Sequence, residues 1–268
     1  MKQNWDDQLR LSEILPDFSA IFEDFAERSA AVFDRHPFQA HQYGPAPRQW
    51  LEWLPGEAQP NRGNRMIMFI HGGYWRARRA EDHRFVLPAL LPGAKYVANA
   101  EYRLLPGARM RDAVADIVAA AQALLRRFPD CELALAGHSA GAHLAACAAR
   151  DERIAAHLSS LILLSGLYDL APVTHSFLQA ELHLTQAEVN AYSIGARPAA
   201  APALLLVGER ETPIFHAQAE QYAGNAGSAQ LRRVAGADHL TILRQLAERK
   251  PTIMTHLDAW DARSSRTR

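Results

Sequence analysis

A nucleophile motif occupies residues 137–141, where the sequence reads Gly-His-Ser-Ala-Gly. The apolar run Glu132–Ala136 before it predicts a buried strand, and the Ala-rich run Ala140–Ala149 predicts a helix. A sharp strand-to-helix turn lifts the central serine clear of the sheet, beside a helix N-terminus that favours negative charge. Only small residues fit two places before and after it, and glycine stands at both. Ser139 is therefore predicted to be a nucleophile; the alternative is a serine that merely caps the helix.

A second motif, His-Gly-Gly-Tyr-Trp, begins at His71, directly after the apolar run Met66–Ile70. Loops of this type form the oxyanion hole of esterases and lipases. Glycines let the backbone approach the substrate, so the N–H of Gly72 or Gly73 is expected to join that of Ala140. Each such donor contributes about 3 kcal/mol to transition-state stabilisation. His71 itself is expected to hold the loop and not to carry a proton.

A serine hydroxyl needs a base, and in this kind of site the chain order is serine, acid, histidine. The sequence has 12 histidines, and His239 follows the last predicted strand, within Gly-Ala-Asp-His. We therefore predict His239 as the general base and acid. The loop after the strand Ala203–Val207 holds no Asp, and Glu211 is preferred there over Glu209. Asp169 is a third option for the acid.

Asp238 adjoins the predicted base and is expected to cap the helix that follows. His138 and His143 are expected to pack or form hydrogen bonds locally, because neither has a third ligand at metal-binding spacing. Cys131 and Cys147 also fit no metal or redox spacing, so both are predicted to be buried free thiols. We expect no metal and no cofactor.

Helical and apolar patterns place these motifs in an α/β fold. Apolar runs alternate with helical patterns from residue 65 onward, which predicts a mostly parallel sheet covered by helices on both faces. The remaining predicted elements are a helix over Ala20–Phe33, a strand at the sheet edge over Arg48–Leu54, the strands Ala94–Ala100, Leu161–Leu164 and Leu231–Val234, and the helices Met110–Phe128, Leu240–Arg249 and Thr252–Ala262.

One domain is predicted for residues 1–268, with an N-terminal helix and edge-strand segment over 1–60. Residues 169–200 interrupt the alternation with helical pieces at Thr174–Leu184 and Gln186–Tyr192. They are expected to form a small cap, together with the N-terminal segment, over the carboxyl ends of the strands, where ligands bind in open α/β sheets.

Composition limits the partners. Lys+Arg and Asp+Glu both count 29 in 268 residues, so the formal net charge is zero and nothing favours nucleic acid or an anionic membrane. No secretory signal and no apolar run of membrane-spanning length is present, so a cytoplasmic location is expected. A small-molecule substrate is the expected partner, and the sequence leaves a homodimer open.

The motifs together resemble the kynurenine formamidase (arylformamidase) family of α/β-hydrolases. The resemblance spans roughly residues 20–260 and is carried by Tyr-Gly-Pro-Ala-Pro-Arg-Gln at 43–49, the loop at 71–75, the motif at 137–141, Leu-Ser-Gly-Leu-Tyr-Asp-Leu at 164–170 and Gly-Ala-Asp-His at 236–239. It implies hydrolysis of an aryl formamide, typically N-formyl-L-kynurenine to L-kynurenine and formate, in tryptophan catabolism. The segment Glu211–Phe215 with Gln218 resembles the acid-bearing segment of the family and supports Glu211.

The chain departs from the family pattern in three places. Ala142 stands where many relatives have a second glycine, the acid is a Glu where animal members have Asp, and the cap region is its own. These departures bear on the substrate more than on the mechanism. The aromatic candidates for the wall of the leaving-group side are Tyr74, Trp75, Tyr102, Tyr168 and Phe177, and a buried core role is the alternative for each of them. His138 is expected to be a further substrate contact.

Two other functions use parts of the same pattern. A short-chain carboxylesterase, or an amidase or thioesterase for another small acyl group, would need the same serine, histidine and acid. A non-catalytic binding protein on this fold would be expected to lack part of that set, whereas here nucleophile, base, acid and oxyanion loop are all present.

Overall fold

The computed structural model describes residues 4–56 and 64–264. Residues 1–3 and 57–60 of the predicted N-terminal segment lie outside this range. The described residues form an eight-stranded sheet in the order β1-β2-β4-β3-β5-β6-β7-β8. Its strands are β1 Gln39–Gln42, β2 Trp50–Pro55, β3 Arg65–Ile70, β4 Tyr96–Ala100, β5 Glu132–His138, β6 Leu158–Leu164, β7 Ala203–Gly208 and β8 Ala229–Val234.

Strand direction divides the sheet in two. From β4 through β3, β5, β6 and β7 to β8 every pair is parallel, whereas β1 pairs with β2, and β2 with β4, in antiparallel fashion. The mostly parallel α/β sheet predicted from the alternation is therefore confirmed. All carboxyl ends of the parallel strands meet at one edge, which is where loops can combine residues distant in sequence.

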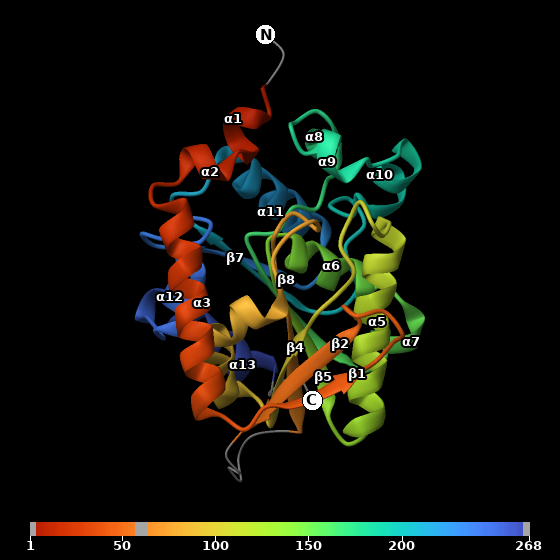
Figure 1. The fold of residues 1–268 in the computed structure, drawn as a ribbon, viewed down its shortest axis with the longest axis vertical. Coiled ribbons are helices and arrows are strands. Elements are labelled where there is room, and N and C mark those ends of the chain that lie inside the picture. The colour runs from red at the N-terminus through yellow and green to blue at the C-terminus, as the bar shows by residue number, and fades with distance from the viewer. Residues whose placement is uncertain (1–3, 57–63, 265–268) are drawn as a thin grey trace.

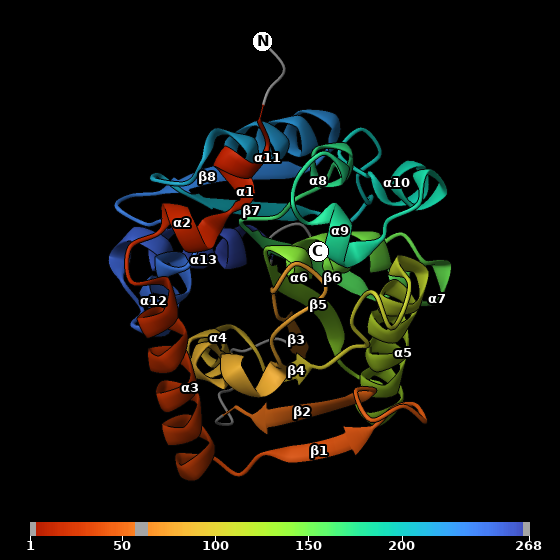
Figure 2. The same cartoon turned by 45° about the horizontal axis from the view of Figure 1, so that its top comes forward.

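Helices cover both faces of the sheet. Figures 1 and 2 show α3, α12 and α13 on one side and α5, α6 and α7 on the other. The helices are α1 Asp6–Leu9, α2 Leu11–Ile14, α3 Phe18–Arg35, α4 Leu87–Leu90, α5 Met110–Arg127, α6 Ala140–Ala148, α7 Glu152–Ala155, α8 Ala171–Thr174, α9 Gln179–Leu182, α10 Gln186–Tyr192, α11 Pro213–Asn225, α12 Thr241–Ala247 and α13 Pro251–Ser264, with 3₁₀ turns η1 Ala80–Val86 and η2 Leu91–Gly93. Within the described residues, no helix has the length and apolar character that crossing a bilayer requires.

Residues 169–200 contain α8, α9 and α10, which lie at the same end of the molecule as α1 and α2 (Figures 1 and 2). The single helix expected over Thr174–Leu184 is two short ones, since the chain turns between them and His183 ends α9 in a left-handed conformation at φ 51°. The helix α10 has the bounds expected for it and begins at a capping box formed by Thr185 and Glu188.

The edge-strand prediction was wrong. The strand near Arg48–Leu54 is β2, and it is internal, because β1, which the sequence pattern did not indicate, forms the edge. Its side chains do not alternate between core and solvent: Leu51, Glu52, Trp53 and Leu54 are all buried. Arg84 pairs with the Glu52 carboxylate at 2.8 Å, which allows a charged residue inside the strand. Both cysteines are buried free thiols, as predicted.

Candidate active site

Ser139 stands at the turn between β5 and α6 in a strained backbone conformation, with φ 55° and ψ −119°. Its N–H donates to the carbonyl of Leu164 at 2.8 Å, which fixes the turn against β6. The flanking glycines are required by space: a Cβ at Gly137 would lie 2.4 Å from the carbonyl of Gly141, and one at Gly141 would lie 2.0 Å from the carbonyl oxygen of Ile70. The strand, turn and helix predicted around Ser139 are therefore all present.

A hydrogen-bonded chain joins the serine to two residues from other loops. His239 Nε2 lies 3.0 Å from Ser139 Oγ, and His239 Nδ1 lies 2.8 Å from Glu211 Oε2. With the proton on Nδ1, the imidazole donates to the carboxylate and keeps Nε2 free to accept the serine proton. The Phe215 ring packs against His239 with centroids 4.3 Å apart, which limits its rotation.

The carboxylate of Glu211 is fully buried and held on both oxygens. Its Oε1 accepts hydrogen bonds from the N–H of Gly208 at 2.7 Å and from the Ser165 hydroxyl, so that Oε2 faces the imidazole. Ser165 follows β6 at a positive φ of 54°, a geometry that a non-glycine residue adopts only under constraint.

The structure does not bring the other acids to the imidazole. Glu209 accepts from the N–H of Gly236 at 2.8 Å. Asp169 accepts from the N–H of Ala171 at 2.9 Å and from the Ser193 hydroxyl. Asp238 accepts from the N–H groups of Leu240 and Thr241, the N-terminal position expected for it before α12. Of the acids weighed from the sequence, Glu211 alone contacts His239.

The loop after β3 lies against the serine. A Cβ built at Gly72 would be 3.2 Å from Ser139 Cβ and 3.0 Å from the carbonyl oxygen of His138, so a larger residue would displace the turn. Gly73 has φ 111°, and a Cβ there would lie 2.2 Å from the carbonyl oxygen of Ala77. Tyr74 and Trp75 also have positive φ values. This close approach brings the Gly72 and Gly73 backbone to the same cavity as Ser139.

Hydrogen bonds from buried side chains hold the loop after β3 in place. Glu101 accepts from the N–H of Ala80 at 2.9 Å, from Arg48 at 2.7 Å and from His71 at 3.3 Å. Burial alone would raise the pKa of Glu101, but these hydrogen bonds and charges lower it below its ordinary value. The Tyr102 hydroxyl donates to the carbonyl of His71 at 3.0 Å. His71 therefore lies in the scaffold of the loop, as the sequence suggested.

His138 packs against His239 and is hydrogen-bonded to its backbone. Its Nε2 donates to the carbonyl oxygen of His239 at 2.7 Å, and the two rings lie 4.8 Å apart. Burial, together with the neighbouring His239, holds the pKa of His138 well below its usual value, so the ring is neutral. The local hydrogen bond expected for His138 is present, and the ring also lines the cavity.

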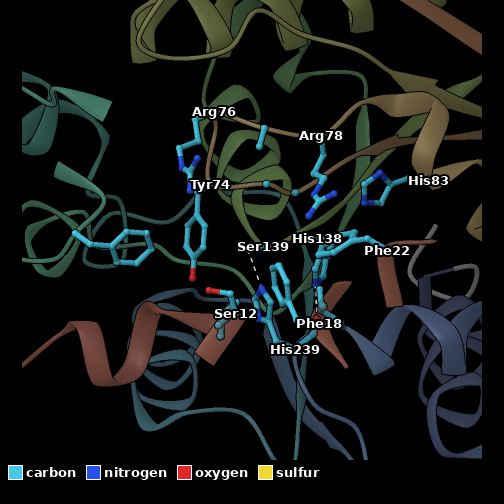
Figure 3. Close-up of a pocket in the computed structure, with 16 residues that line it drawn as sticks. Ser12, Phe18, Phe22, Tyr74, Arg76, Arg78, His83, His138, Ser139 and His239 are labelled. Atoms are coloured by element: carbon cyan, nitrogen blue, oxygen red, sulfur yellow. Dashed lines mark hydrogen bonds between the residues drawn. The ribbon is translucent and has the colours of Figure 1, made fainter. Parts of the chain in front are cut away.

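A cavity of about 230 Å³ opens in front of Ser139 and His239 (Figure 3). Its walls come from α2 and α3, from the loop after β3, from the segment before α9 and from the start of α12. The lining residues are Leu11, Ser12, Phe18, Phe22, Gly72, Gly73, Tyr74, Arg76, Ala77, Arg78, His83, His138, Ser139, Phe177, His239 and Leu240.

The N-terminal wall of the cavity, formed by α2 and the start of α3, follows a segment that is hydrogen-bonded to the rest of the site. The Tyr74 hydroxyl donates to the carbonyl of Leu9 at 2.7 Å, and Thr212 Oγ1 donates to the carbonyl of Gln8 at 2.9 Å. The N–H of Ile214, one turn beyond Glu211, donates to Gln8 Oε1 at 2.8 Å. Segments about 200 residues apart in sequence thus meet around one cavity.

The structure divides the aromatic wall candidates into residues that line the cavity and residues that lie in the core. Tyr74 and Phe177 line the cavity, with ring centroids 6.5 Å apart. Trp75 does not: it is fully buried, and its Nε1 donates to His143 Nδ1 at 3.2 Å, so the substrate contact assigned to it is incorrect. Tyr102 and Tyr168 are also fully buried in the core. In each case the aromatic ring fills space beneath the site, which the sequence pattern does not distinguish from a wall.

Sequence reasoning missed several cavity residues. Phe18 and Phe22 lie on α3, where the sequence predicted a helix over Ala20–Phe33 but no ligand contact, and Arg78 lies beyond the recognised glycine loop. Ser165 was overlooked because nothing local marks a hydroxyl that meets a carboxylate 46 positions later. The apolar face of α3 next to polar Ser12 was the one available signal that this segment borders a ligand site.

Comparisons with known proteins agree with this geometry. A family model described as alpha/beta hydrolase fold matches residues 67–193. Kynurenine formamidase of Danio rerio is 24% identical over 262 residues, covering 91% of this chain and 88% of the relative. Kynurenine formamidase of Salmo salar is 26% identical over 200 residues, 68% of each chain.

Solved structures share the fold at low identity. A putative thioesterase from Silicibacter sp. TM1040 superposes with a TM-score of 0.82 at 22% identity, covering 92% of this chain and 95% of that one. Esterase B from Lactobacillus rhamnosis gives a TM-score of 0.70 at 18% identity, covering 93% and 96%.

Fold and comparisons define the class: the protein is a hydrolase with the α/β-hydrolase fold. Within that class its sequence is similar to proteins named kynurenine formamidase, which confirms the resemblance drawn from its motifs.

Proposed function

We propose that the protein is a serine hydrolase that cleaves aryl formamides, with N-formyl-L-kynurenine as the substrate and L-kynurenine and formate as the products. The observation that carries this proposal is the hydrogen-bonded chain from Glu211 through His239 to Ser139 at the floor of an aromatic cavity. The two similar proteins named kynurenine formamidase support the choice of substrate.

In the first half of the reaction, Ser139 Oγ attacks the formyl carbon while His239 Nε2 accepts its proton. Glu211 stabilises the imidazolium and keeps Nδ1 protonated. Negative charge develops on the formyl oxygen, where the amides of Ala140 and of Gly72 or Gly73 act as donors. The C–N bond then breaks, and His239 returns the proton to the leaving arylamine.

In the second half, water attacks the formyl ester of Ser139. His239 takes a proton from this water, the Ser139 Oγ–C bond breaks, and the proton returns to the serine as formate leaves. A formyl group carries only hydrogen, so the acyl side of the site needs little room. The aromatic walls of Phe18, Phe22 and Phe177 suit an arylamine leaving group.

The test compares turnover of N-formyl-L-kynurenine with that of 4-nitrophenyl acetate by purified protein. Formamide cleavage with kcat/KM at least comparable to that for the ester supports the proposal. Efficient ester cleavage with negligible formamide cleavage would overturn it in favour of a short-chain carboxylesterase, which the same serine, histidine and acid can serve.

A non-catalytic binding role is tested by Ser139→Ala. If Ser139 is the nucleophile, this variant loses about 10⁴-fold or more in kcat for whichever substrate is turned over, because residual rate then comes from binding and the oxyanion donors alone. Turnover retained in Ser139→Ala would refute the assignment.

A further inference from the structure

The ionisable residues lining the cavity include two arginines but no aspartate or glutamate. The remaining titratable members are Tyr74, His83, His138 and His239. The first arginine, Arg76, is already neutralised, because its guanidinium lies 2.6 Å from the carboxylate of Glu181. The second, Arg78, therefore dominates the charge that the cavity presents to a ligand.

Arg78 has no counter-ion of its own among the described residues. Asp82 is the acid whose charge acts on it, but no carboxylate lies within ion-pair distance of its guanidinium in that part of the chain. Partial burial disfavours the charged form and lowers the pKa of Arg78 from its ordinary value, but a guanidinium stays protonated in proteins, so the group is cationic. A part-buried cation without a partner is costly, which suggests that a ligand supplies the missing anion.

The orientation of this guanidinium leaves its donors available. Its central carbon lies 3.3 Å from the centre of the Phe22 ring, so the planar group stacks on the aromatic face. Stacking occupies the face of a guanidinium and leaves the N–H groups at its edge free, in the fork that binds a carboxylate through two parallel hydrogen bonds. Figure 3 shows the side chain extending from the loop toward His138 and Phe22.

The backbone under Arg78 is also fixed in place. Arg78 has φ 73°, a left-handed conformation that is strained for a residue with a long side chain. Arg48 Nη2 donates to the Arg78 carbonyl oxygen at 2.6 Å, and the same Arg48 pairs with buried Glu101. The scaffold that shapes the glycine loop thus also sets the position of Arg78, so the cation is held before a ligand arrives.

We propose that Arg78 binds a carboxylate on the leaving-group side of the substrate, so that the site prefers aryl formamides that carry a carboxylate to those that do not. The inference rests on the proposed formamidase function and deepens it, since it names the part of the substrate that is recognised apart from the formyl group. The aromatic rings beside Arg78 take the arene, and the guanidinium takes the acid that the arene carries.

The experiment measures kcat/KM for two substrates that differ only in the α-carboxylate: N-formyl-L-kynurenine, in which it stands beside an α-ammonium group, and the carboxamide, which keeps the ammonium group alone. Wild-type protein is expected to favour the carboxylate. In Arg78→Gln the ratio of the two values falls by about 10- to 100-fold, the range for a lost charged hydrogen bond, with KM carrying most of the change. Arg78→Lys, which keeps the charge but not the fork, gives an intermediate ratio.

The matched control is Arg79→Gln, which removes the same charge from the next residue. The Arg79 side chain is exposed, pairs with Glu81 at 2.7 Å and does not line the cavity. In Arg79→Gln the ratio of kcat/KM for the carboxylate to that for the carboxamide is expected to change by less than about twofold, because an exposed charge is screened by water. An equal fall in Arg78→Gln and Arg79→Gln would mean that bulk charge, and not contact, produces the preference, and would overturn the proposal.

Failure of the substrate assignment is separable from failure of the subsite. If wild-type protein cleaves both formamides and Arg78→Gln leaves their ratio unchanged, Arg78 is not a carboxylate ligand although the formamidase function stands. If neither formamide is cleaved, the same variants are compared on 4-acetoxybenzoate and phenyl acetate. A ratio that falls in Arg78→Gln then supports an anion subsite in an esterase, and an unchanged ratio excludes it.

Discussion

Ser165 donates its hydroxyl hydrogen bond to Glu211 Oε1, the carboxylate oxygen that does not face His239. Together with the N–H of Gly208, this contact fixes the carboxylate in one rotation. Ser165 does not line the cavity, so in the proposed mechanism it is a positioning residue that acts through Glu211.

Ser165→Ala is therefore expected to lower kcat about 10-fold with little change in KM. The imidazolium forms only in the transition state, so a carboxylate that is less well oriented toward it weakens transition-state stabilisation and not substrate binding. Steady-state kinetics measure both parameters. The matched control is Ser159→Ala, which removes a hydroxyl bonded to the carbonyl of Leu133 at the far end of the same strand. A rise in KM with unchanged kcat would contradict the positioning role.

The identity of the acid is tested with isosteric amides. Glu211→Gln should lower kcat by about 10⁴-fold, since the amide no longer enforces the tautomer in which His239 Nε2 accepts the serine proton. Glu209→Gln, two residues earlier, removes a carboxylate whose hydrogen-bond partner within residues 4–56 and 64–264 is the N–H of Gly236, and it should keep kcat within about twofold. The reverse order of effects would transfer the role to Glu209.

Gly141→Ala should destabilise the protein by several kcal/mol or prevent folding, because its Cβ would lie 2.0 Å from the carbonyl oxygen of Ile70. Gly224→Ala provides the comparison: it lies inside α11 with open space around it and should gain about 0.5–1 kcal/mol from helix propensity. Urea unfolding measures both. Similar free energies of unfolding for the two variants would show that the elbow has room the structure does not indicate.

Stability is expected to fall as the pH drops below about 6.5. Burial lowers the pKa of His143 to about 4 and that of His83 to about 3. Between these pKa values and about 6.5, these histidines are protonated in the unfolded chain but neutral in the folded one. The free energy of unfolding therefore rises with pH over this range. Each of these two histidines is expected to lower the free energy of unfolding by about 2 kcal/mol when the pH falls from 7 to 5.

Unfolding at the two pH values measures this loss, and His143→Gln should reduce the difference by about 2 kcal/mol. In the native protein His143 Nδ1 accepts from Trp75 and Nε2 donates to the carbonyl of Tyr192 at 2.8 Å, which only the neutral ring can do. His41→Gln, at an exposed position on the edge strand, is the control. An undiminished pH difference in His143→Gln would count against the argument.

Local patterns were enough to predict most of the parallel sheet and two of the three joined residues. Ser139 is marked by the glycines that its turn requires, and His239 by its place after the last strand. Glu211 followed from chain order and from the resemblance. β1 was missed because its residues Gln39–Gln42 are polar and exposed, and α11 because its apolar residues are not gathered on one face.

Contacts between distant segments were beyond the reach of local patterns. Trp75 and Tyr74 are neighbours with similar side chains, yet one packs under α6 against His143 and the other faces the cavity. Which one faces the cavity depends on the backbone of the loop, where both residues have positive φ values that no local pattern encodes.

The N-terminal wall of the cavity couples ligand binding to the docking of the N-terminal segment. Because Gln8 and Leu9 are held by Thr212, Ile214 and Tyr74, docking of this segment and occupancy of the cavity are linked equilibria. A ligand that touches Phe18 and Phe22 only when the segment is docked must suppress its local opening by an amount set by ligand concentration and affinity. Amide hydrogen exchange around residues 8–22 should thus report binding even in a protein whose serine has been replaced.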